Sequence, residues 1–410
     1  MKFGIIGQRL GHSFSKELHG KCGIDYEVVE LQPDDVENFV KNCRLDGFNV
    51  TIPYKKAVMQ YLDELDQSAQ QVGAVNTVVV QGGKTRGYNT DYAGLRAMIV
   101  NSGVDLSARC VLVLGSGGAS ATACAVAKTL GAADVCVVSR CGEIDYTNVY
   151  AKKANANVII NATPVGMFPA EEGTPIDVKS FPELEAVFDC VYNPIRPNIV
   201  LDAMECGIVA KGGLEMLITQ GIEAQKIWGV YDKQKAEIAA KCLISQKNNL
   251  VLSGMAGAGK TTLGRLVAKA LNRPFFDLDE EICRCTGRAP AQIIKTCGEE
   301  EFRQVESDVL YDLTRSGGKV ISLGGGAVLR AENVRAAKRN GILIYVVRDL
   351  DLLDSTGRPL SQKEGVQALF ERRRPIYEST CDGRVNNSGD INEVAKEIVR
   401  LYEDISYKRS

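Results

Sequence analysis

The sequence contains few of the residues that build metal centres and disulfide frameworks. Its 410 residues include two histidines, His12 and His19, and none of its 13 cysteines belongs to a Cys-x-x-Cys pair. A zinc centre normally needs four such side chains at characteristic spacings, so we expect no zinc site. The cysteines are odd in number and scattered, so we expect them to be reduced thiols in a cytosolic protein.

Net charge and long hydrophobic segments are also lacking. The formal net charge is −2, and no apolar run approaches the roughly 20 residues that a membrane helix needs. The first residues, MKFGIIGQRL, lack the apolar core of a secretory signal and predict a strand. We therefore expect neither a nucleic-acid partner nor a membrane partner. The sequence does not indicate the oligomeric state.

A glycine-rich stretch divides the chain. Residues 250–252 form a short apolar run, GMAGAGKT follows, and residues 263–271 have the pattern of an amphipathic helix. Strand, glycine loop and helix N-terminus in this order are typical of a phosphate-binding loop, and the flanking elements disfavour an accidental Gly-rich turn with a Lys. The predicted ATP-binding residues are Gly254, Ala256, Gly257, Ala258, Gly259, Lys260, Thr261 and Thr262. The Thr261 hydroxyl can also ligate Mg²⁺.

Such a loop normally opens its own domain, and here it begins after about 250 residues. A chain of 410 residues is too long for one core and predicts two or three domains. The polar sequence SQKNN over 245–249 predicts a short linker between the two halves.

A second glycine-rich turn lies in the first half. The buried strand pattern over 110–114 runs into Gly115, Gly117, Gly118 and Ala119, and an Ala-rich helix and a strand over 134–139 follow. This order predicts a Rossmann-like dinucleotide-binding unit. The second strand ends at Ser139-Arg140 instead of an acidic residue, which suits a 2′-phosphate and predicts NADP; a plain surface cation is the alternative for Arg140. Only about 20 residues separate Arg140 from Asn161, which predicts a unit short by a helix and perhaps a strand.

Polar residues recur near strand ends in the first 92 residues. The Ser13 and Ser15 hydroxyls, at alternate positions, could hold one carboxylate, although composition alone favours Ser15 as a helix N-cap before KELHGK. The others could bind a ligand at the ends of strands or could serve only in turns and caps. They are Asn49, Thr51, Asn76, Asn89, Thr90 and Asp91.

The first half resembles shikimate dehydrogenase, over essentially all of residues 1–245. The stretches that carry the resemblance are 12–15, 49–55, 73–78, 87–91, 161–163 with Gly166-Met167, and Met216-Leu217 with Gln220. It implies reversible, NADPH-dependent reduction of 3-dehydroshikimate to shikimate, with Lys55 and Asp91 as the catalytic pair. The implied substrate-binding residues are Ser13, Ser15, Thr51, Asn76, Tyr192 and Gln220. The implied NADP-binding residues are Gly115, Gly117, Gly118, Ala119, Ser139, Arg140, Thr163 and Met167. Given this resemblance, we expect Ser13 and Ser15 to bind the carboxylate rather than to cap the helix.

The second half resembles shikimate kinase, over about residues 248–405. Besides the phosphate-binding loop, the resemblance rests on 276–279, 302–303, 324–326, 358–360 and 373–377. It implies transfer of the ATP γ-phosphoryl group to the shikimate 3-hydroxyl. We expect Asp277 and Asp279 to lie on one face of a strand. Asp277 would position Mg²⁺ together with Thr261, and Asp279 would hold or deprotonate the shikimate 3-hydroxyl. The other implied catalytic residues are Lys260 and Arg358, and Arg358 belongs to a lid predicted over 354–364. The implied substrate-binding residues are Arg303, Gly324, Gly325, Gly326 and Arg373. A helix over 369–374 should end before Pro375.

We therefore predict an α/β protein. Residues 1–92, completed by helices over about 214–244, would form a substrate-binding domain. Residues 93–213 would form a Rossmann-like NADP domain. After the linker over 245–249, a P-loop kinase domain with a parallel sheet would fill 250–410. The predicted function is a bifunctional enzyme that makes and then phosphorylates shikimate. The alternatives are a catalytically impaired sensor of metabolites and nucleotides, and a dehydrogenase that also accepts quinate.

Overall fold

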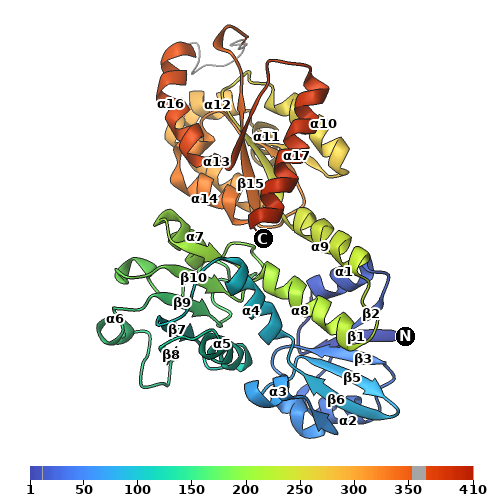
Figure 1. Cartoon of the computed structure of the whole chain (residues 1–410). Coiled ribbons are helices and arrows are strands. Elements are labelled where there is room, and N and C mark those ends of the chain that lie inside the picture. Colours follow the sequence, from blue (N-terminus) through green and yellow to red (C-terminus); the bar gives the residue numbers. More distant parts are fainter. Residues whose placement is uncertain (12, 353–365, 410) are drawn as a thin grey trace. The chain divides into compact units, whose positions relative to one another are not determined.

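The computed structural model describes residues 1–11, 13–352 and 366–409. The chain forms two compact units, Met1–Leu243 and Ile244–Ser410, whose strands make three β-sheets (Figure 1). His12, Arg358 and the lid predicted over 354–364 lie outside the described residues.

The first sheet has the strand order β2-β1-β3-β5-β6-β4. Its strands are β1 (Lys2–Gly7), β2 (Asp25–Glu30), β3 (Gly47–Val50), β4 (Glu64–Leu65), β5 (Thr77–Gln81) and β6 (Lys84–Tyr88). β1 pairs in parallel with β2 and β3, whereas β5 runs antiparallel to β3 and β6. The accompanying helices are α1 (Phe14–Lys21), η1 (Pro33–Asp35), α2 (Val36–Lys41), η2 (Ala57–Tyr61) and α3 (Gln67–Val72). Because β1 and β3 are parallel, the loops that follow them leave the sheet at the same edge.

The second sheet is entirely parallel, with the order β11-β10-β9-β7-β8. Its strands are β7 (Cys110–Leu114), β8 (Asp134–Val138), β9 (Val158–Asn161), β10 (Ala186–Asp189) and β11 (Val209–Lys211). Its helices are α5 (Gly118–Thr129), α6 (Val149–Lys152), η3 (Val178–Ser180) and α7 (Asn198–Glu205). A full dinucleotide-binding sheet has the order 3-2-1-4-5-6. The described residues contain no counterpart of its third strand, and only the four-residue α6 lies between β8 and β9, which agrees with the predicted shortening.

Two helices lead the chain back to the first sheet. α8 (Leu214–Ile227) packs against α4 (Asp91–Asn101), and α9 (Lys233–Lys247) follows. The Trp228 indole N–H donates to the Val78 carbonyl at 3.0 Å, and its ring stacks on Phe3 with centroids 4.6 Å apart. Trp228, directly after α8, thus contacts β5 and β1 of the first sheet.

The third sheet is parallel throughout, with the order β13-β14-β12-β15-β16. Its strands are β12 (Asn249–Ser253), β13 (Phe275–Asp277), β14 (Val320–Ser322), β15 (Gly341–Val347) and β16 (Gly383–Asn386). Alternation along β12 sends Leu250 and Leu252 to one core and Val251 to the other, so helices cover both faces (Figure 1). α10 (Lys260–Leu271) and α17 (Ile391–Arg409) cover the first. The other face carries α11 (Leu278–Thr286), α12 (Pro290–Cys297), α13 (Glu299–Thr314), η4 (Ala327–Leu329), α14 (Ala331–Arg339) and α16 (Val366–Thr380). A 3-10 turn, η5, spans Leu350–Leu352.

The predicted linker over 245–249 is not a loop. α9 continues through Lys247 and β12 begins at Asn249, which leaves one residue, Asn248, between them. The Asn248 side chain donates to the Ile244 carbonyl at 2.9 Å. The Tyr402 hydroxyl bonds the carbonyls of Ser245 and Asn248 at 2.8 and 2.9 Å. Partners for these last carbonyls of the helix explain why a polar sequence stays helical here.

Two further expectations differ from the structure. α16 runs through Pro375 to Thr380 instead of ending before it, because Leu369 and Tyr377 on either side are both fully buried in the core. Asp277 ends β13, and its carboxylate accepts the Asp279 backbone N–H at 3.1 Å as an N-cap. Asp279 therefore lies in the first turn of α11 and not on the same strand face as Asp277.

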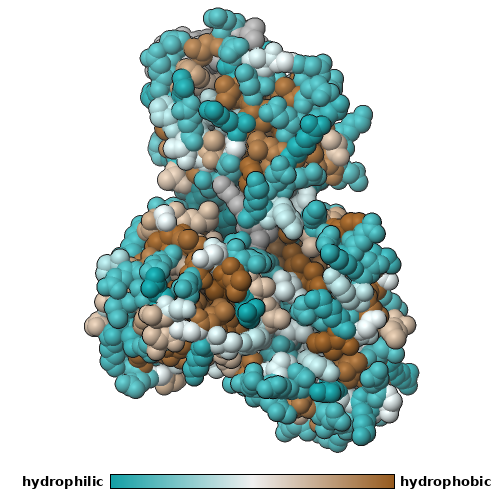
Figure 2. Space-filling view, viewed as in Figure 1, coloured by the Kyte–Doolittle hydropathy of each residue, from teal (hydrophilic) through white to brown (hydrophobic). Residues whose placement is uncertain are grey.

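The described residues contain neither a disulfide bond nor a helix that could span a membrane. None of the 13 cysteines, all within the described residues, forms a disulfide. No helix in the described ranges combines the length and apolar character needed to cross a bilayer. On the face shown in Figure 2, hydrophilic residues surround separate hydrophobic patches, as is ordinary for protein surfaces.

Replacing Tyr402 by Phe should destabilise the second unit by about 2 kcal/mol, because the buried carbonyls of Ser245 and Asn248 lose a donor. Urea unfolding followed by circular dichroism measures this. The exposed Tyr407 on the same helix is the matched control, and its change to Phe should alter stability by less than about 0.5 kcal/mol. Equal effects of the two substitutions would contradict the assigned role of the Tyr402 hydroxyl.

Candidate active sites

An ion pair with little exposure lies in the first unit. The Lys55 ammonium is 2.6 Å from a carboxylate oxygen of Asp91, and the two side chains are 19% and 9% exposed. Lys55 follows β3 and its carbonyl accepts the Val75 backbone N–H at 2.8 Å, whereas Asp91 is the first residue of α4. A carboxylate is favoured at that helix end by the helix dipole. The structure thus brings together the two residues predicted as a catalytic pair.

Further predicted substrate residues lie near one another. The Asn76 side-chain amide donates to the Thr90 hydroxyl at 3.0 Å, and the Thr90 backbone N–H donates to the Asn76 side-chain oxygen at 2.7 Å. The Gln220 side-chain oxygen, from α8, is 3.5 Å from the Asn76 amide nitrogen and from the Thr90 hydroxyl. Thr90 immediately precedes Asp91, so this polar group adjoins the ion pair.

The two serines take different places in α1. Ser13 is the N-cap and accepts the Lys16 backbone N–H at 3.3 Å, while Ser15 lies inside the helix and is 8% exposed. The capping role considered for Ser15 therefore belongs to Ser13. The Phe14 ring lies 5.1 Å, centroid to centroid, from the ring of Tyr192, which follows β10. Thr51, at the end of β3, donates its backbone N–H to Ile6 in β1 at 3.0 Å. The predicted substrate residues thus come from adjoining segments.

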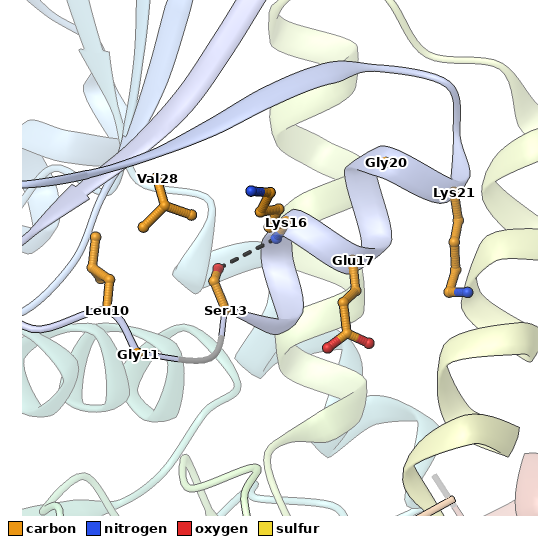
Figure 3. Close-up of a pocket in the computed structure, with 8 residues that line it drawn as sticks. All are labelled: Leu10, Gly11, Ser13, Lys16, Glu17, Gly20, Lys21 and Val28. Carbon is orange, nitrogen blue, oxygen red and sulfur yellow. Dashed lines mark hydrogen bonds between the residues drawn. The ribbon is translucent and has the colours of Figure 1, made fainter.

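A groove of about 600 Å³ runs along one face of α1 (Figure 3). It shares Ser13 with the predicted substrate set, and the figure shows the bond from the Lys16 backbone to the Ser13 hydroxyl. Its lining consists of Leu10, Gly11, Ser13, Lys16, Glu17, Gly20, Lys21 and Val28. Neither Lys55 nor Asp91 lines this groove, so it does not contain the ion pair.

The glycine turn of the second sheet lies against Lys55. A Cβ added to Gly118, at the start of α5, would lie 3.6 Å from the Cβ atom of Lys55. Gly117 is the N-cap of α5 and offers no side-chain bond to the first N–H groups, which suits an anion there. A Cβ on Gly115 would lie 3.1 Å from the Thr163 methyl group, so these two predicted cofactor residues adjoin.

The other predicted cofactor residues lie in the first turn of α5 and on loops after β8 and β9. Ala119 is in the first turn of α5, Ser139 and the exposed Arg140 follow β8, and Met167, 39% exposed, follows β9. All of them leave the carboxyl ends of strands of the second sheet or belong to the helix after β7, where dinucleotides bind in such folds.

Asp189 is a buried carboxylate that sequence analysis did not assign to the site. It lies at the end of β10 and accepts the Asn161 side-chain amide at 3.0 Å and the Val191 backbone N–H at 2.8 Å. Asn161 in turn accepts the Thr163 hydroxyl at 2.7 Å. Burial raises the pKa of Asp189 to about 7. An acidic residue at the end of a buried parallel strand was the available signal.

The glycine loop of the second unit surrounds its lysine. Gly254, Gly257 and Gly259 have φ values of 140°, 88° and 89°, in the left-handed region that favours glycine. The Lys260 ammonium donates to the carbonyls of Gly254 and Met255 at 2.9 Å each. The Thr261 hydroxyl donates to a carboxylate oxygen of Asp277 at 2.7 Å. The two predicted Mg²⁺ ligands are therefore adjacent.

Sequence analysis also missed the residues that support this loop from outside. The Asn387 side-chain amide, after β16, donates to the Ala258 carbonyl at 2.8 Å. Arg348, after β15, lies 3.5 Å from the Gly257 carbonyl. Both residues come from strands distant in sequence, so no local pattern marks them.

The predicted acid-binding arginines surround the three glycines. Arg373 donates to the Gly325 carbonyl at 3.1 Å. A Cβ on Gly326 would lie 2.4 Å from an Arg303 guanidinium nitrogen, so only glycine allows this approach. A Cβ on Gly324 would lie 3.3 Å from an Asp279 carboxylate oxygen. The structure therefore brings all the described residues of this predicted set together.

Glu306 belongs to the same cluster and was missed. It is 1% exposed, and one carboxylate oxygen accepts from Arg303 at 2.6 Å while the other has no hydrogen-bond partner among the described residues. Burial raises its pKa, and the charge of Arg303 opposes that shift. A position three residues after Arg303 on a helix could have indicated the pair.

Comparison with known proteins identifies the first unit. Residues 5–78 match the family model of the shikimate dehydrogenase substrate-binding domain. The shikimate dehydrogenase (NADP(+)) of Clostridium perfringens strain SM101 is 34% identical over 251 residues, which cover 55% of this chain and 91% of that protein. The chain belongs to the shikimate dehydrogenase family. The glycine turn, Lys55 and Asp91 thus lie within a shikimate dehydrogenase unit.

Solved shikimate dehydrogenases share its fold. The enzyme from Thermus thermophilus, in complex with NADP(H) and shikimate, is 29% identical with a TM-score of 0.53, over 59% of this chain and 99% of that one. A chorismate mutase/shikimate 5-dehydrogenase fusion from Clostridium acetobutylicum is 33% identical with a TM-score of 0.54, over 59% and 96%. After its shikimate dehydrogenase unit this chain continues differently, because residues 256–403 match the shikimate kinase family model.

Changing Asp189 to Asn should remove a pH dependence from the stability of the shikimate dehydrogenase unit. Because the folded pKa of about 7 lies above the usual 3.8, the unfolded chain releases this proton first. Stability should therefore fall between about pH 4 and pH 7, by up to about 1.4 kcal/mol per pH unit. Trp228 is the only tryptophan and is buried in this unit, so its fluorescence during urea unfolding gives the measurement. A wild-type slope unchanged in the variant would disprove the assignment.

Changing Gly326 to Ala should raise the shikimate KM of the kinase about tenfold, because the new methyl group displaces the Arg303 guanidinium. Reduction of 3-dehydroshikimate by the same protein should be unchanged. Gly389→Ala is the matched control, since a Cβ there meets nothing within 4 Å. An unaltered kinase KM for the Gly326 variant would count against Arg303 as a substrate ligand.

Proposed function

We propose that this chain catalyses two consecutive reactions on one cyclic acid. The first unit reduces 3-dehydroshikimate to shikimate with NADPH, and the second transfers the γ-phosphoryl group of ATP to the shikimate 3-hydroxyl. The observation that supports this best is that each unit gathers acid-binding and reactive side chains around its own phosphate-binding glycine turn. The 13 free thiols support a reducing, cytosolic location.

In the first reaction Lys55 acts on the oxygen of the ketone. As negative charge develops there, the ammonium stabilises it and transfers a proton to it, which yields the hydroxyl. The carboxylate of Asp91, 2.6 Å away, accepts a hydrogen bond from the ammonium and holds its direction. NADPH, when bound, supplies the hydride that reduces the carbonyl carbon.

The remaining residues of the first unit orient the substrate. Ser13 and Ser15 donate hydroxyl bonds to the carboxylate, and Tyr192 lies beside the same helix turn. Thr51, Asn76 and Gln220 bond the ring hydroxyls. Because these groups come from separate segments of the chain, they define one ring orientation relative to Lys55.

The residues around the second sheet fit a dinucleotide. The start of α5 has no side-chain cap and lies against Lys55, so a pyrophosphate at Gly115, Gly117, Gly118 and Ala119 would be close to the ion pair. Thr163 and Met167 would adjoin the nicotinamide end, and Ser139 with Arg140 would hold the 2′-phosphate at the other end.

In the second reaction the shikimate 3-oxygen attacks the γ-phosphorus and ADP leaves. Asp279 accepts the proton of the attacking hydroxyl, and Arg303 with Arg373 holds the carboxylate. Lys260 neutralises charge on the β- and γ-phosphates. We also assign Arg358 to this charge neutralisation, by its place in the family motif alone.

A magnesium ion fits beside the glycine loop. The Thr261 hydroxyl and the Asp277 carboxylate are 2.7 Å apart, and Mg²⁺ in such sites takes one or two protein oxygens besides phosphates and water. When bound, the ion would neutralise phosphate charge.

A single mixture tests the whole proposal. Purified chain, 3-dehydroshikimate, NADPH and Mg-ATP should oxidise NADPH and yield shikimate 3-phosphate. Consumption of neither cofactor would favour the catalytically impaired sensor. Quinate offered with NADP⁺ in place of shikimate tests the broader dehydrogenase.

Changing Lys55 to Ala should lower NADPH oxidation at least about a thousandfold, since the proton donor is lost. Phosphorylation of added shikimate should persist, because Lys55 belongs to the first unit. The neighbouring, exposed Lys56 provides the control, and its change to Ala should leave both rates unchanged. The converse variant, Asp279→Asn, should lose phosphorylation and keep NADPH oxidation.

A further inference from the structure

A line of buried polar side chains leads from β2 to the substrate residues of the first unit. Tyr26, Asn49 and Thr77 lie on three strands of the first sheet and are 5%, 4% and 0% exposed. The Tyr26 hydroxyl donates to the Asn49 side-chain oxygen at 2.7 Å, and the Asn49 amide nitrogen donates to the Thr77 hydroxyl at 3.0 Å. The line therefore begins at a residue remote from the ion pair.

The Tyr26 hydroxyl fixes which way the Asn49 amide faces. Its proton requires an acceptor, so the Asn49 oxygen must point toward β2 and the amide nitrogen toward β5. In that orientation the nitrogen also donates to the Asn76 backbone carbonyl at 3.2 Å. With the amide reversed, the Asn49 oxygen would face that carbonyl, and two acceptors would meet with no proton between them.

The orientation of the Asn49 amide also affects the hydrogen bonds of the substrate residues. Because Thr77 accepts from Asn49, its own proton is directed toward the Asn76 side-chain oxygen at 3.2 Å or the Thr90 hydroxyl at 3.1 Å. The Asn76 oxygen also accepts the Thr90 backbone N–H at 2.7 Å, so the amide nitrogen of Asn76 faces Thr90 at 3.0 Å and Gln220 at 3.5 Å. Asn76 therefore presents N–H groups, not its carbonyl, toward Gln220.

The surroundings keep the Tyr26 ring in place. The ring of His19 stacks on it with centroids 4.5 Å apart, and the His19 ring nitrogen Nδ1 lies 3.1 Å from the Gln225 amide nitrogen. Burial lowers the pKa of His19 to about 3, so this neighbour stays neutral at ordinary pH.

We propose that Tyr26 is a positioning residue for the dehydrogenase substrate, acting through Asn49 on the donors that Asn76 and Thr90 present. The proposal rests on the proposed function of the first unit. Tyr26 does not contact the reacting atoms; its hydroxyl sets the donor direction of the line. Its removal should weaken substrate binding and leave the chemical step nearly intact.

The test compares two tyrosines of the same unit. Tyr26→Phe should raise the KM for 3-dehydroshikimate at least about fivefold, with kcat and the NADPH KM within about twofold of wild type. The control is Tyr54→Phe, because the hydroxyl of the buried Tyr54 donates to a backbone carbonyl, that of Leu31 at 2.6 Å, and does not join the line. Its KM should stay within about twofold of wild type.

A double-mutant cycle tests the route through Asn49. After Asn49→Leu, adding Tyr26→Phe should change the substrate KM by less than about twofold, because the line is already broken. Full additivity of the two effects would overturn the proposal, as would an unchanged KM in Tyr26→Phe.

Two controls keep these outcomes distinct from misfolding. Trp228 fluorescence reports the fold of the first unit, and kinase activity reports the second unit of the same molecule. If Tyr26→Phe fails to fold, Thr77→Val breaks the line one step later and must raise the same KM by about fivefold or the proposal fails. A wild-type chain that does not reduce 3-dehydroshikimate would refute the proposed function instead.

Discussion

Parallel strands bring their carboxyl ends to one edge of a sheet, and both candidate sites depend on this constraint. In the third sheet, Asp277, Ser322 and Leu252 are register partners across β13, β14 and β12. The glycine loop, the Mg²⁺ ligands and the three glycines therefore emerge side by side. In the second sheet, Leu114, Asn161 and Asp189 are likewise partners across β7, β9 and β10. The glycine turn and Thr163 consequently adjoin.

Charged groups held out of water distinguish the sites from the rest of the molecule. Lys55 with Asp91 and Arg303 with Glu306 are ion pairs with little exposure. Burying such pairs seldom stabilises a fold beyond what apolar residues would, whereas removing one partner typically costs about 3–5 kcal/mol. Their presence is therefore better explained by the ligands that we propose for these sites than by stability.

Sequence reasoning succeeded where the chemistry lies in short contiguous motifs. The glycine loop, the 324–326 glycines and the pair Lys55 and Asp91 each follow a strand pattern that the residues themselves display. The α/β fold class and the shortened second sheet followed from the same patterns. Family, fold and paired enzymatic domains were thereby predicted correctly, and the comparisons agree.

It failed where a residue acquires its role from a distant partner. Asp189 and Asn387 bond Asn161 and Ala258, which are distant in sequence. Glu306 is the exception, because its partner Arg303 is three residues away on the same helix and that spacing was overlooked. Element boundaries failed for a related reason. Pro375 disfavours a helix in isolation, and the polar residues after Ile244 resemble a linker, but buried neighbours and hydrogen-bond partners keep these segments helical.

The single residue between α9 and β12 has a consequence for how the chain can be cut. Proteases bind their targets as extended segments, so they cleave where a stretch of backbone can leave its hydrogen bonds. From Ser245 to Asn249 the backbone is helix, one buried asparagine and then a buried strand. This joint offers a protease no extended stretch of its own, and separating the two enzymes by digestion there would first require local unfolding.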